Sequence, residues 1–494
     1  MDRLTSRTCD SEPTSRGVVL CAASLEDRWA LRRHGRYMLL GAVLDRFAQK
    51  TPVTVMTRAI LEHALTPSAL DALFVEHAEH QYQDKLLFSS VVDLMGLVVC
   101  KVQPSVNAAY QAVKETLPVS LTAVYDKLNR LEPATIASLV RHVGARLGPV
   151  IRTMGGQLPE PIPGYRTKIV DGNHLAATDR RIAELRESKA GPLPGHALVV
   201  LDPSLMLAID LVPCEDAHAQ ERSLFGQLLE RVEPKDVWVA DRNFCTAGFL
   251  AGVAARAGYF IIRQHAHLTI RGAGTLRRRG VCDGGTIFEQ KVTLEGEDGA
   301  PIALRRVVIR LDVPTRKGDA EVAVLTNLPS EDASALVVAR VYRQRWSIER
   351  LFHALTQTLN GEMASLGYPG AALFAFAVAL VSYNMSSVIY AALRAEFGHE
   401  RVQEEVSGYY IANEVRVMHG GLDVMTEDND WTLYRTMSPE QLGVALRSLA
   451  SKVRLPAFKR HPRGPKKPVP PRTKHAQSPH VSTARLLRET GRLR

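Results

Sequence analysis

The chain has 494 residues, of which 46% are hydrophobic and 23% charged, and this excludes a wholly disordered protein. The length predicts roughly two to four folding units with large buried cores. The formal net charge of +10 lies almost entirely in the segment Leu455–Arg494, where eleven lysines and arginines stand against the single acid Glu489. This tail is also rich in proline, so we expect a solvated arm that either binds a polyanion or only adds solubility.

The six cysteines are scattered without a Cys-x-x-Cys pair, so neither a zinc site nor a disulfide framework is predicted. The N-terminus has no apolar core followed by a cleavage site, so we expect no secretory signal and a cytoplasmic protein. The longest apolar stretch begins at Ala371, but Ser382, Asn384, Ser386 and Ser387 interrupt it. A buried, alanine-rich core helix is therefore favoured over a membrane span.

The pattern of the chain changes several times along its length. Residues 1–35 are polar and mixed, and an arm is expected there. Residues 36–155 show helical periodicity, for which an ordinary bundle and a DNA-end-binding domain are equally good interpretations. After the linker "GGQLPEPIPGY", residues 160–264 alternate strands with helices, which predicts an α/β core.

The second half of the chain begins with residues 265–336, where the signals are almost purely β and predict a β-rich insertion in the α/β domain. Helical periodicity resumes over residues 337–398, which are expected to complete the core, and continues over residues 399–455 as a helical C-terminal region. Residues 456–494 form the basic tail. The fold class predicted from this order is α/β, with helical regions at both ends.

Two aspartates end strand-like runs of the α/β segment. Asp171 closes "TKIVDG" and Asp241 closes "VWVADRN", each after apolar residues that a sheet would bury. Carboxylates at strand ends stand at the rim of the sheet, the usual place for a site in an α/β fold. Since aspartate also begins turns and caps helices, each of the two has an ordinary structural interpretation when taken alone.

The segment "VYRQRWSIERLFHAL", residues 341–355, holds a third acid. On a continuous helix, six polar or aromatic side chains fall within an arc of about 80°, namely Tyr342, Arg345, Trp346, Glu349, His353 and Thr356. This arc presents a carboxylate beside aromatic and cationic groups. An Arg345–Glu349 ion pair is the structural alternative, but arginine before glutamate is the weaker order and contributes about a few tenths of a kcal/mol.

Three carboxylates from two strands and a helix suggest one kind of chemistry. They could hold two divalent cations about 4 Å apart, one activating a water or a 3′-hydroxyl and the other stabilising the leaving oxygen of a phosphoryl displacement. Hard oxygen ligands select Mg²⁺ or Mn²⁺. The residues thus favour metal-dependent phosphoryl transfer.

With Asp171 in "DGNHLAATD", Asp241 in "ADRNF" and Glu349 in "YRQRWSIE", the chain resembles the DDE transposases of bacterial insertion sequences over about residues 165–390. More narrowly it resembles the insertion-sequence-four family, whose signature is Tyr, two residues, Arg, three residues, Glu, six residues, Lys. Tyr342, Arg345 and Glu349 match its first three positions. The resemblance implies an RNase H-like catalytic core interrupted by a β-rich insertion.

The same resemblance implies that Asp171, Asp241 and Glu349 ligate two Mg²⁺ or Mn²⁺ ions. The enzyme would cut DNA at the terminal inverted repeats of its element, join the freed 3′-hydroxyls to target DNA, act as a homodimer on paired ends and associate with the nucleoid. DNA contacts are expected from the helix and from the basic tail, at Tyr342, Arg345, Trp346, His353, Lys459, Arg460, Arg463, Lys466 and Lys467.

Two positions depart from the family pattern. Thr356 replaces the signature lysine and keeps a hydrogen-bonding group without the charge, so His353 or a residue from elsewhere would have to substitute. Relatives that form a hairpin intermediate stack a base on an aromatic of the insertion, where this chain has Phe288 but no tryptophan, its four being Trp29, Trp238, Trp346 and Trp431. Asp179 is an auxiliary acid or an ordinary helix cap.

Cut-and-paste transposition is the favoured function, and three alternatives stay open. The first is a catalytically impaired, transposase-derived DNA-binding protein, for which Thr356 is the hint. The second is a nuclease of the same fold without joining activity. The third is a DNA-binding or regulatory protein whose acids are structural, which the intact set of three acids disfavours.

Overall fold

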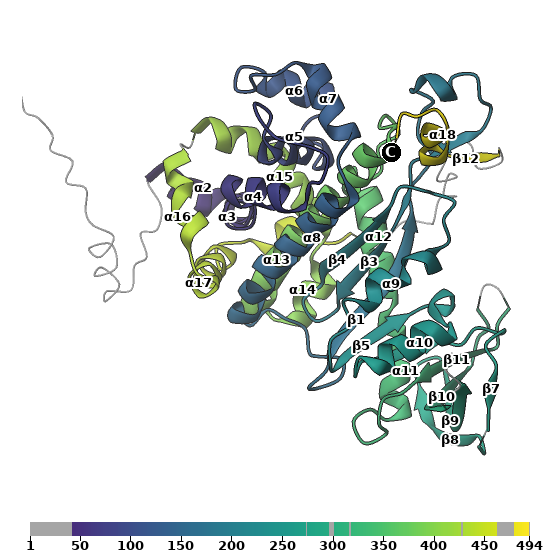
Figure 1. Ribbon diagram of the computed structural model, residues 1–494. Coiled ribbons are helices and arrows are strands. Elements are labelled where there is room, and N and C mark those ends of the chain that lie inside the picture. The colour runs from purple at the N-terminus through teal and green to yellow at the C-terminus, as the bar shows by residue number, and fades with distance from the viewer. Residues whose placement is uncertain are drawn as a thin grey trace, which may run out of the picture.

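The computed structural model describes residues 42–272, 274–295, 301–315, 318–425, 428–461 and 479–493. The predicted arm of residues 1–35 lies outside the described residues, and so do Arg463, Lys466 and Lys467 of the tail. A body of helices and a long β-sheet stand side by side, with the sheet extending away from the helices at one end (Figure 1).

The sheet has ten strands in the order β4-β3-β1-β5-β6-β11-β10-β9-β7, with β8 also beside β9. The strands β1, β5 and β6 are parallel to one another, and the remaining neighbours are antiparallel. Their bounds are β1 (Arg166–His174), β3 (His196–Asp202), β4 (Leu207–Cys214), β5 (Asp236–Ala240), β6 (Tyr259–Arg263), β7 (Ile270–Arg271), β8 (Arg277–Cys282), β9 (Gly285–Glu295), β10 (Pro301–Leu311) and β11 (Glu321–Thr326).

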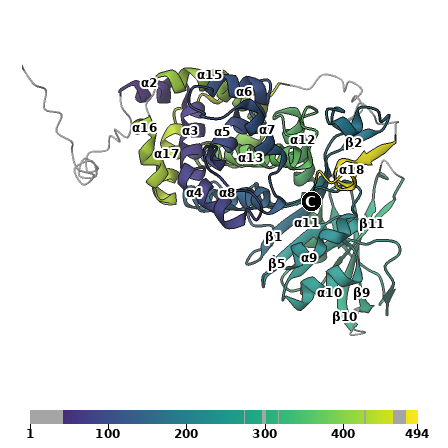
Figure 2. The same ribbon diagram turned by 45° about the horizontal axis from the view of Figure 1, so that its top comes forward.

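The β-rich segment predicted between residues 265 and 336 continues this sheet instead of standing apart from it. The join is the antiparallel pairing of β11 with β6, in which Leu325 lies opposite Ile262. Both side chains are fully buried, so the hydrophobic core of the α/β part continues across the join. The strands β7 to β10 form the far end of the sheet (Figures 1 and 2).

Alternate residues of the central strands face two different cores, because successive side chains of a strand point to opposite faces. Ile169 and Val199 pack with the helices α8 (Pro133–Met154) and α13 (Pro369–Phe397) on one face. Val170 and Val200 pack on the other face with the short helices α9 (Phe225–Leu229) and α10 (Ala247–Ala255). The near-continuous apolar runs of these strands follow from burial on both faces.

The helical body is built from both ends of the chain around α13. Its members are α2 (Ala42–Lys50), α3 (Pro52–Ala64), α4 (Pro67–His77), α5 (Phe88–Val99), α6 (Val106–Val113), α7 (Leu121–Asn129), α14 (His399–Glu405), α15 (Gly408–Met425), α16 (Asp428–Thr436), α17 (Pro439–Ala450) and the 3₁₀ turn η5 (Leu455–Phe458), with α8. An ion pair of 2.7 Å joins Glu62 of α3 to Arg435 of α16. The two helical segments expected over residues 36–155 and 399–455 thus pack on each other.

The helix α13 is long and apolar enough to cross a membrane, but 89% of its most apolar window is buried inside the protein. This confirms the prediction of a buried core helix. Asn384, which interrupts the apolar stretch, is fully buried and exchanges two hydrogen bonds of 2.8 Å with the backbone of Ala208 in β4. Its amide thereby satisfies the backbone N–H and C=O of a residue in the outermost strand, so this polar side chain is compatible with a buried core helix.

Part of the C-terminal tail is folded against the α/β core. The strand β12 (His480–Ser482) pairs in parallel with β2 (Gly191–Leu193), and α18 (Thr483–Glu489) follows. Ser482 and Arg485 both bind the carboxylate of Asp216, each at 2.8 Å. The prediction of a solvated arm is therefore wrong for residues 479–493. In this segment Leu487 packs in a small buried cluster with Ile182 and Leu185, and Arg485 pairs with Asp216.

Candidate active site

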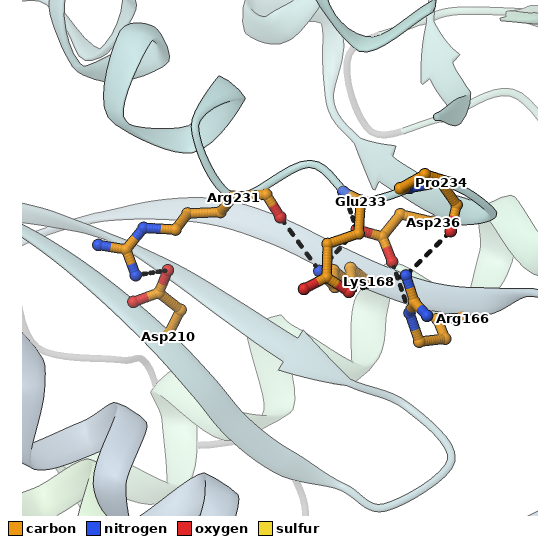
Figure 3. Close-up of polar contacts among 7 residues, drawn as sticks. All are labelled: Arg166, Lys168, Asp210, Arg231, Glu233, Pro234 and Asp236. Atoms are coloured by element: carbon orange, nitrogen blue, oxygen red, sulfur yellow. Dashed lines mark hydrogen bonds and ion pairs between the residues drawn. The ribbon is translucent and has the colours of Figure 1, made fainter. Parts of the chain in front are cut away.

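An ion-pair network around the buried Asp236 fixes the starts of β1 and β5 to each other (Figure 3). Asp236, the first residue of β5, is fully buried, and its carboxylate accepts hydrogen bonds from Arg166 Nε at 2.9 Å and Lys168 Nζ at 2.7 Å on β1. It also accepts one from the backbone N–H of Glu233 at 2.8 Å. These contacts set the register in which Ile169 lies beside Val239.

This register brings the two predicted aspartates to the same level. Asp171 lies two residues beyond Ile169, and Asp241 lies two residues beyond Val239. Asp241 directly follows β5, as predicted, whereas Asp171 does not end its strand. The strand β1 continues to His174 because its far side pairs antiparallel with β3, from Ile169 opposite Leu201 to His174 opposite His196. Asp171 therefore stands on a rigid, paired strand.

The third acid is carried by a helix that begins at a break in the helical path. We predicted one helix through residues 341–355, but α11 (Ala335–Gln344) and α12 (Trp346–Gln357) meet at Arg345. At the junction the backbone N–H of Arg345 donates to the carbonyl of Tyr342, and that of Ile348 donates to the carbonyl of Arg345. These i→i+3 bonds tighten the chain as in a 3₁₀ turn.

Arg345 joins two of the three acids. Its Nη1 donates to Asp171 Oδ2 at 2.8 Å and its Nη2 donates to Glu349 Oε1 at 2.7 Å. The Arg345 and Asp171 side chains are 12% and 20% exposed, so water screens the bond between them little. The Glu349 side chain is 54% exposed, so its bond to Arg345 is screened more. The Arg345–Glu349 pair considered in the sequence is formed, but the same guanidinium also reaches across to β1.

Burial governs the ionisation of the acid at the centre. It raises the pKa of Asp171 to about 7, and the charges of Asp241 and Glu221 act in the same direction, while Arg345 and the backbone N–H of Gly172 oppose the shift. Burial likewise raises the pKa of the Tyr342 hydroxyl, so the tyrosine is neutral at physiological pH. A perturbed carboxyl in this setting is typical of a functional site.

The donor chemistry of these residues fits a hard divalent cation, because carboxylate oxygens are the ligands that Mg²⁺ and Mn²⁺ prefer. A ready cage is nevertheless absent: across the part of the chain that the structure describes, no group of three or more Asp, Glu, His or Cys side chains is arranged to hold a metal. Arg345 stands between Asp171 and Glu349, in the place where a shared cation would have to enter.

The other predicted residues fall into two groups. Trp346 and His353 lie on the exposed face of α12 with Glu349, and Trp346 is 62% exposed. The Thr356 hydroxyl donates to the carbonyls of Phe352 and His353 in its own helix, each at 3.2 Å, so it offers neither a charge nor an uncommitted proton.

The remaining predicted positions lie on other elements. Asp179 lies in the loop after β1, where it pairs with Arg181 and its backbone N–H binds the carbonyl of Ala364. Lys459 and Arg460 are exposed and lie against the helical body, where the backbone N–H of Arg460 donates to the carbonyl of Glu405.

The sequence did not point to Glu221, which the fold places beside Gly172 and Asn243. Glu221 belongs to the 3₁₀ turn η3 (Glu221–Leu224), and Asn243 belongs to the 3₁₀ turn η4 (Arg242–Phe244) that follows Asp241. No motif or spacing in "AQERSLF" marks this glutamate, because its place depends on how the connection between β4 and β5 folds back.

Two comparisons with known proteins bear on this site. Residues 163–385 match the family described as "Transposase DDE domain", a range that begins just before β1, ends within α13 and includes all three acids. A protein of Sinorhizobium fredii (strain NBRC 101917 / NGR234), named "Putative transposase y4zB", is 24% identical over 198 residues, which are 37% of this chain and 52% of that protein. The match thus spans about half of the relative's length. Together these findings support a DDE transposase.

Proposed function

We propose that the chain is a transposase of the insertion-sequence-four type, which cuts DNA at the ends of its element and joins the freed 3′-hydroxyls to target DNA. The observation that carries this proposal is the placement of Asp171 within β1 at the level of Asp241, which directly follows the neighbouring parallel strand β5, with Glu349 held to Asp171 through Arg345. The proposal includes an RNase H-like core, to which the mixed sheet is suited, and a homodimer on paired ends.

In this proposal Asp171, Asp241 and Glu349 hold two Mg²⁺ or Mn²⁺ ions, which when bound activate the attacking oxygen and stabilise the leaving one. Arg345 and Tyr342 serve the phosphate next to the cut, since a guanidinium forms charge-assisted bonds to phosphate and a neutral phenol donates one more. Trp346 and His353 are exposed beside Glu349 and can stack on or bind an unpaired nucleotide.

A basic surface at the far end of the sheet supports DNA as the partner. A cavity of about 320 Å³ there is lined by Arg277, Arg279, Lys291 and Arg305, with Glu289 as the single acid. Arg279 and Arg305 pair with Glu289. Within the described ranges, Arg277 and Lys291 have no ion-pair partner, and both are exposed, so they are suited to bind phosphates.

The basic surface also lies close enough to the acids for one DNA duplex to contact both. The strand β8 runs along α11, since Gly280 lies against Leu336 near the start of this helix and Arg343 near its end binds the carbonyl of Asp283. The ten residues of α11 span about 15 Å, or about four or five base pairs of a duplex. Arg277 lies three strand residues before Gly280, about 10 Å farther from Arg345. One DNA duplex laid along α11 would contact both.

The test is nicking of DNA that carries the element's own terminal repeats by the purified full chain with Mg²⁺ or Mn²⁺. Asp171→Asn, Asp241→Asn and Glu349→Gln should each abolish nicking and leave DNA binding in place. Metal-dependent cleavage that persists in all three variants would remove the assignment of these acids. Joined products with target DNA would separate a transposase from a nuclease that only cuts.

A DNA-binding protein without catalysis is the second candidate, and the bonds of the Thr356 hydroxyl to its own helix favour it. The family lysine expected at this position would bring a phosphate-binding charge that Thr356 lacks. In that case the full chain would bind the terminal repeats with no nicking at any Mg²⁺ or Mn²⁺ concentration. Hairpin formation is a less supported step, because the ring of Phe288 is covered by the Arg310 guanidinium at 4.3 Å.

A further inference from the structure

Each of the two aspartates has one carboxylate oxygen fixed by a nearby backbone N–H. Gly172 N donates to Asp171 Oδ1 at 3.0 Å, and Asn243 N donates to Asp241 Oδ1 at 2.8 Å. The orientation of the Asp171 carboxylate therefore depends on the position of the Gly172 backbone, and that of the Asp241 carboxylate depends on the position of the Asn243 backbone. A shift of either segment would change the distance between the two carboxylates.

Glu221 contacts both of these segments at once. Its Oε2 accepts a hydrogen bond from Asn243 Nδ2 at 3.3 Å. Its Oε1 lies directly over Gly172, where a Cβ atom would be 2.1 Å from this oxygen. No real side chain tolerates that distance, so the glycine provides the room that the Glu221 carboxylate occupies. One carboxylate thus contacts both Gly172, within β1, and Asn243, in the turn after β5.

The segment that carries Glu221 is itself held rigidly to the Asp241 turn. Phe225, four residues after Glu221, stacks on Phe244 of η4 with ring centroids 4.9 Å apart and an interplanar angle of 20°. Leu224 and Phe225 are both buried in the core on this face of the sheet. The aromatic contact anchors α9, which directly follows η3, to η4. Glu221 therefore cannot move with β1 without moving the turn after Asp241 as well.

We propose that Glu221 is a positioning residue of the candidate active site, which fixes the spacing of Asp171 and Asp241 by contacting Gly172 with one carboxylate oxygen and Asn243 with the other. This inference rests on the proposed function, in which the two aspartates share metal ions. Removing a group that orients metal ligands typically weakens metal affinity by about ten- to a hundredfold. Glu221 does so through shape and hydrogen bonding, so an uncharged group of the same shape suffices.

The experiment measures Mn²⁺ binding to the full chain without DNA, by the electron paramagnetic resonance signal of free Mn²⁺. Glu221→Ala should weaken Mn²⁺ affinity by about tenfold or more. Glu221→Gln keeps the volume and an acceptor for Asn243, so its affinity should remain close to wild type. Glu230→Ala is the matched control, since it removes an exposed carboxylate that directly follows the short helix α9, whereas Glu221 lies just before this helix.

A second pair of variants tests the contact with Gly172. Gly172→Ala should displace Glu221 and weaken Mn²⁺ binding as Glu221→Ala does. In the Glu221→Ala background the same change should add nothing, because the next atom that the new Cβ would meet is Leu198 Cδ2 at 3.5 Å, an ordinary contact. Such non-additivity is what two residues in direct contact produce. At saturating Mn²⁺ the nicking rate of Glu221→Ala should return to that of the wild type.

Three outcomes would overturn the inference, and they differ from failure of the proposed function. Wild-type affinity in Glu221→Ala would remove the positioning role. An equal loss in Glu221→Gln and Glu221→Ala would show that the charge matters instead of the contacts. Additive effects of Gly172→Ala and Glu221→Ala would contradict the shared contact. Mn²⁺ binding that Asp171→Asn leaves intact would refute the proposed metal site itself, and the inference with it.

Discussion

The substitution Asp236→Ala should destabilise the protein strongly, although Asp236 lies at the opposite end of β1 and β5 from the acids. Its fully buried carboxylate neutralises Lys168, whose side chain is only 15% exposed, at 2.7 Å. Removing one partner of a buried pair leaves an uncompensated charge and costs about 3–5 kcal/mol. Arg166 is 54% exposed and loses little, but the backbone N–H of Glu233 also loses its acceptor, at about 1 kcal/mol.

The matched control is Glu233→Ala. Glu233 pairs with the same Arg166 at 2.8 Å, but the two side chains are 65% and 54% exposed, so the loss should be at most about 1 kcal/mol. Urea unfolding of the two variants and the wild type, followed by circular dichroism, gives the comparison. Equal and small losses in both variants would refute the reasoning that burial makes Asp236 the important partner. The Asp236→Ala variant should also bind Mn²⁺ more weakly, because the β1–β5 register places the acids.

Three further predictions concern the site and its surroundings. Burial raises the pKa of Asp171 to about 7, and a metal binds the ionised form of this carboxylate. The Mg²⁺ affinity measured by calorimetry should therefore rise by up to about tenfold per pH unit below pH 7 and level off above it. A flat pH profile would contradict this. Above pH 7, Arg345→Gln should increase the Mg²⁺ affinity of the protein in the absence of DNA. Arg350→Gln, at an exposed position of α12, should leave this affinity unchanged. Replacing Arg277 and Lys291 together by Gln should lower the logarithmic slope of the salt dependence of DNA binding by about two. Aggregation with an unchanged slope would mean that Arg277 only protects the edge strand β8.

The sequence was sufficient for the features that depend on local pattern. Asp241 follows a fully buried run of five residues, and α13 is a buried helix because its apolar stretch is too continuous for any surface. The end of β1 could not be found this way, since "DGNH" has the composition of a turn. Only the pairing with β3, a contact between distant segments, keeps these residues extended.

The site shows the same division between local pattern and tertiary contact. Arg345 and Glu349 are four residues apart, so their pairing could be weighed from spacing alone, but the second bond of Arg345 to Asp171 crosses 174 positions of sequence. Glu221 was missed for this reason: it meets Gly172 and Asn243 only after the sheet has formed. The helical break at Arg345 was missed because no glycine or proline marks it, and the residue keeps helical dihedral angles.

The position of Arg345 explains how carboxylates that repel one another can lie close together in the folded protein. A catalytic set must hold carboxylates close enough to share a cation, yet like charges at such separations repel in a partly buried setting. The guanidinium between Asp171 and Glu349 supplies one positive charge, and the raised pKa of Asp171 shows that this compensation is incomplete. A divalent ion carries twice that charge in a smaller volume, so it would compete well for the carboxylates once the guanidinium has another partner. A DNA phosphate is such a partner, because it accepts the paired donors of an arginine as a carboxylate does. Metal binding and DNA binding should therefore strengthen each other through this one side chain.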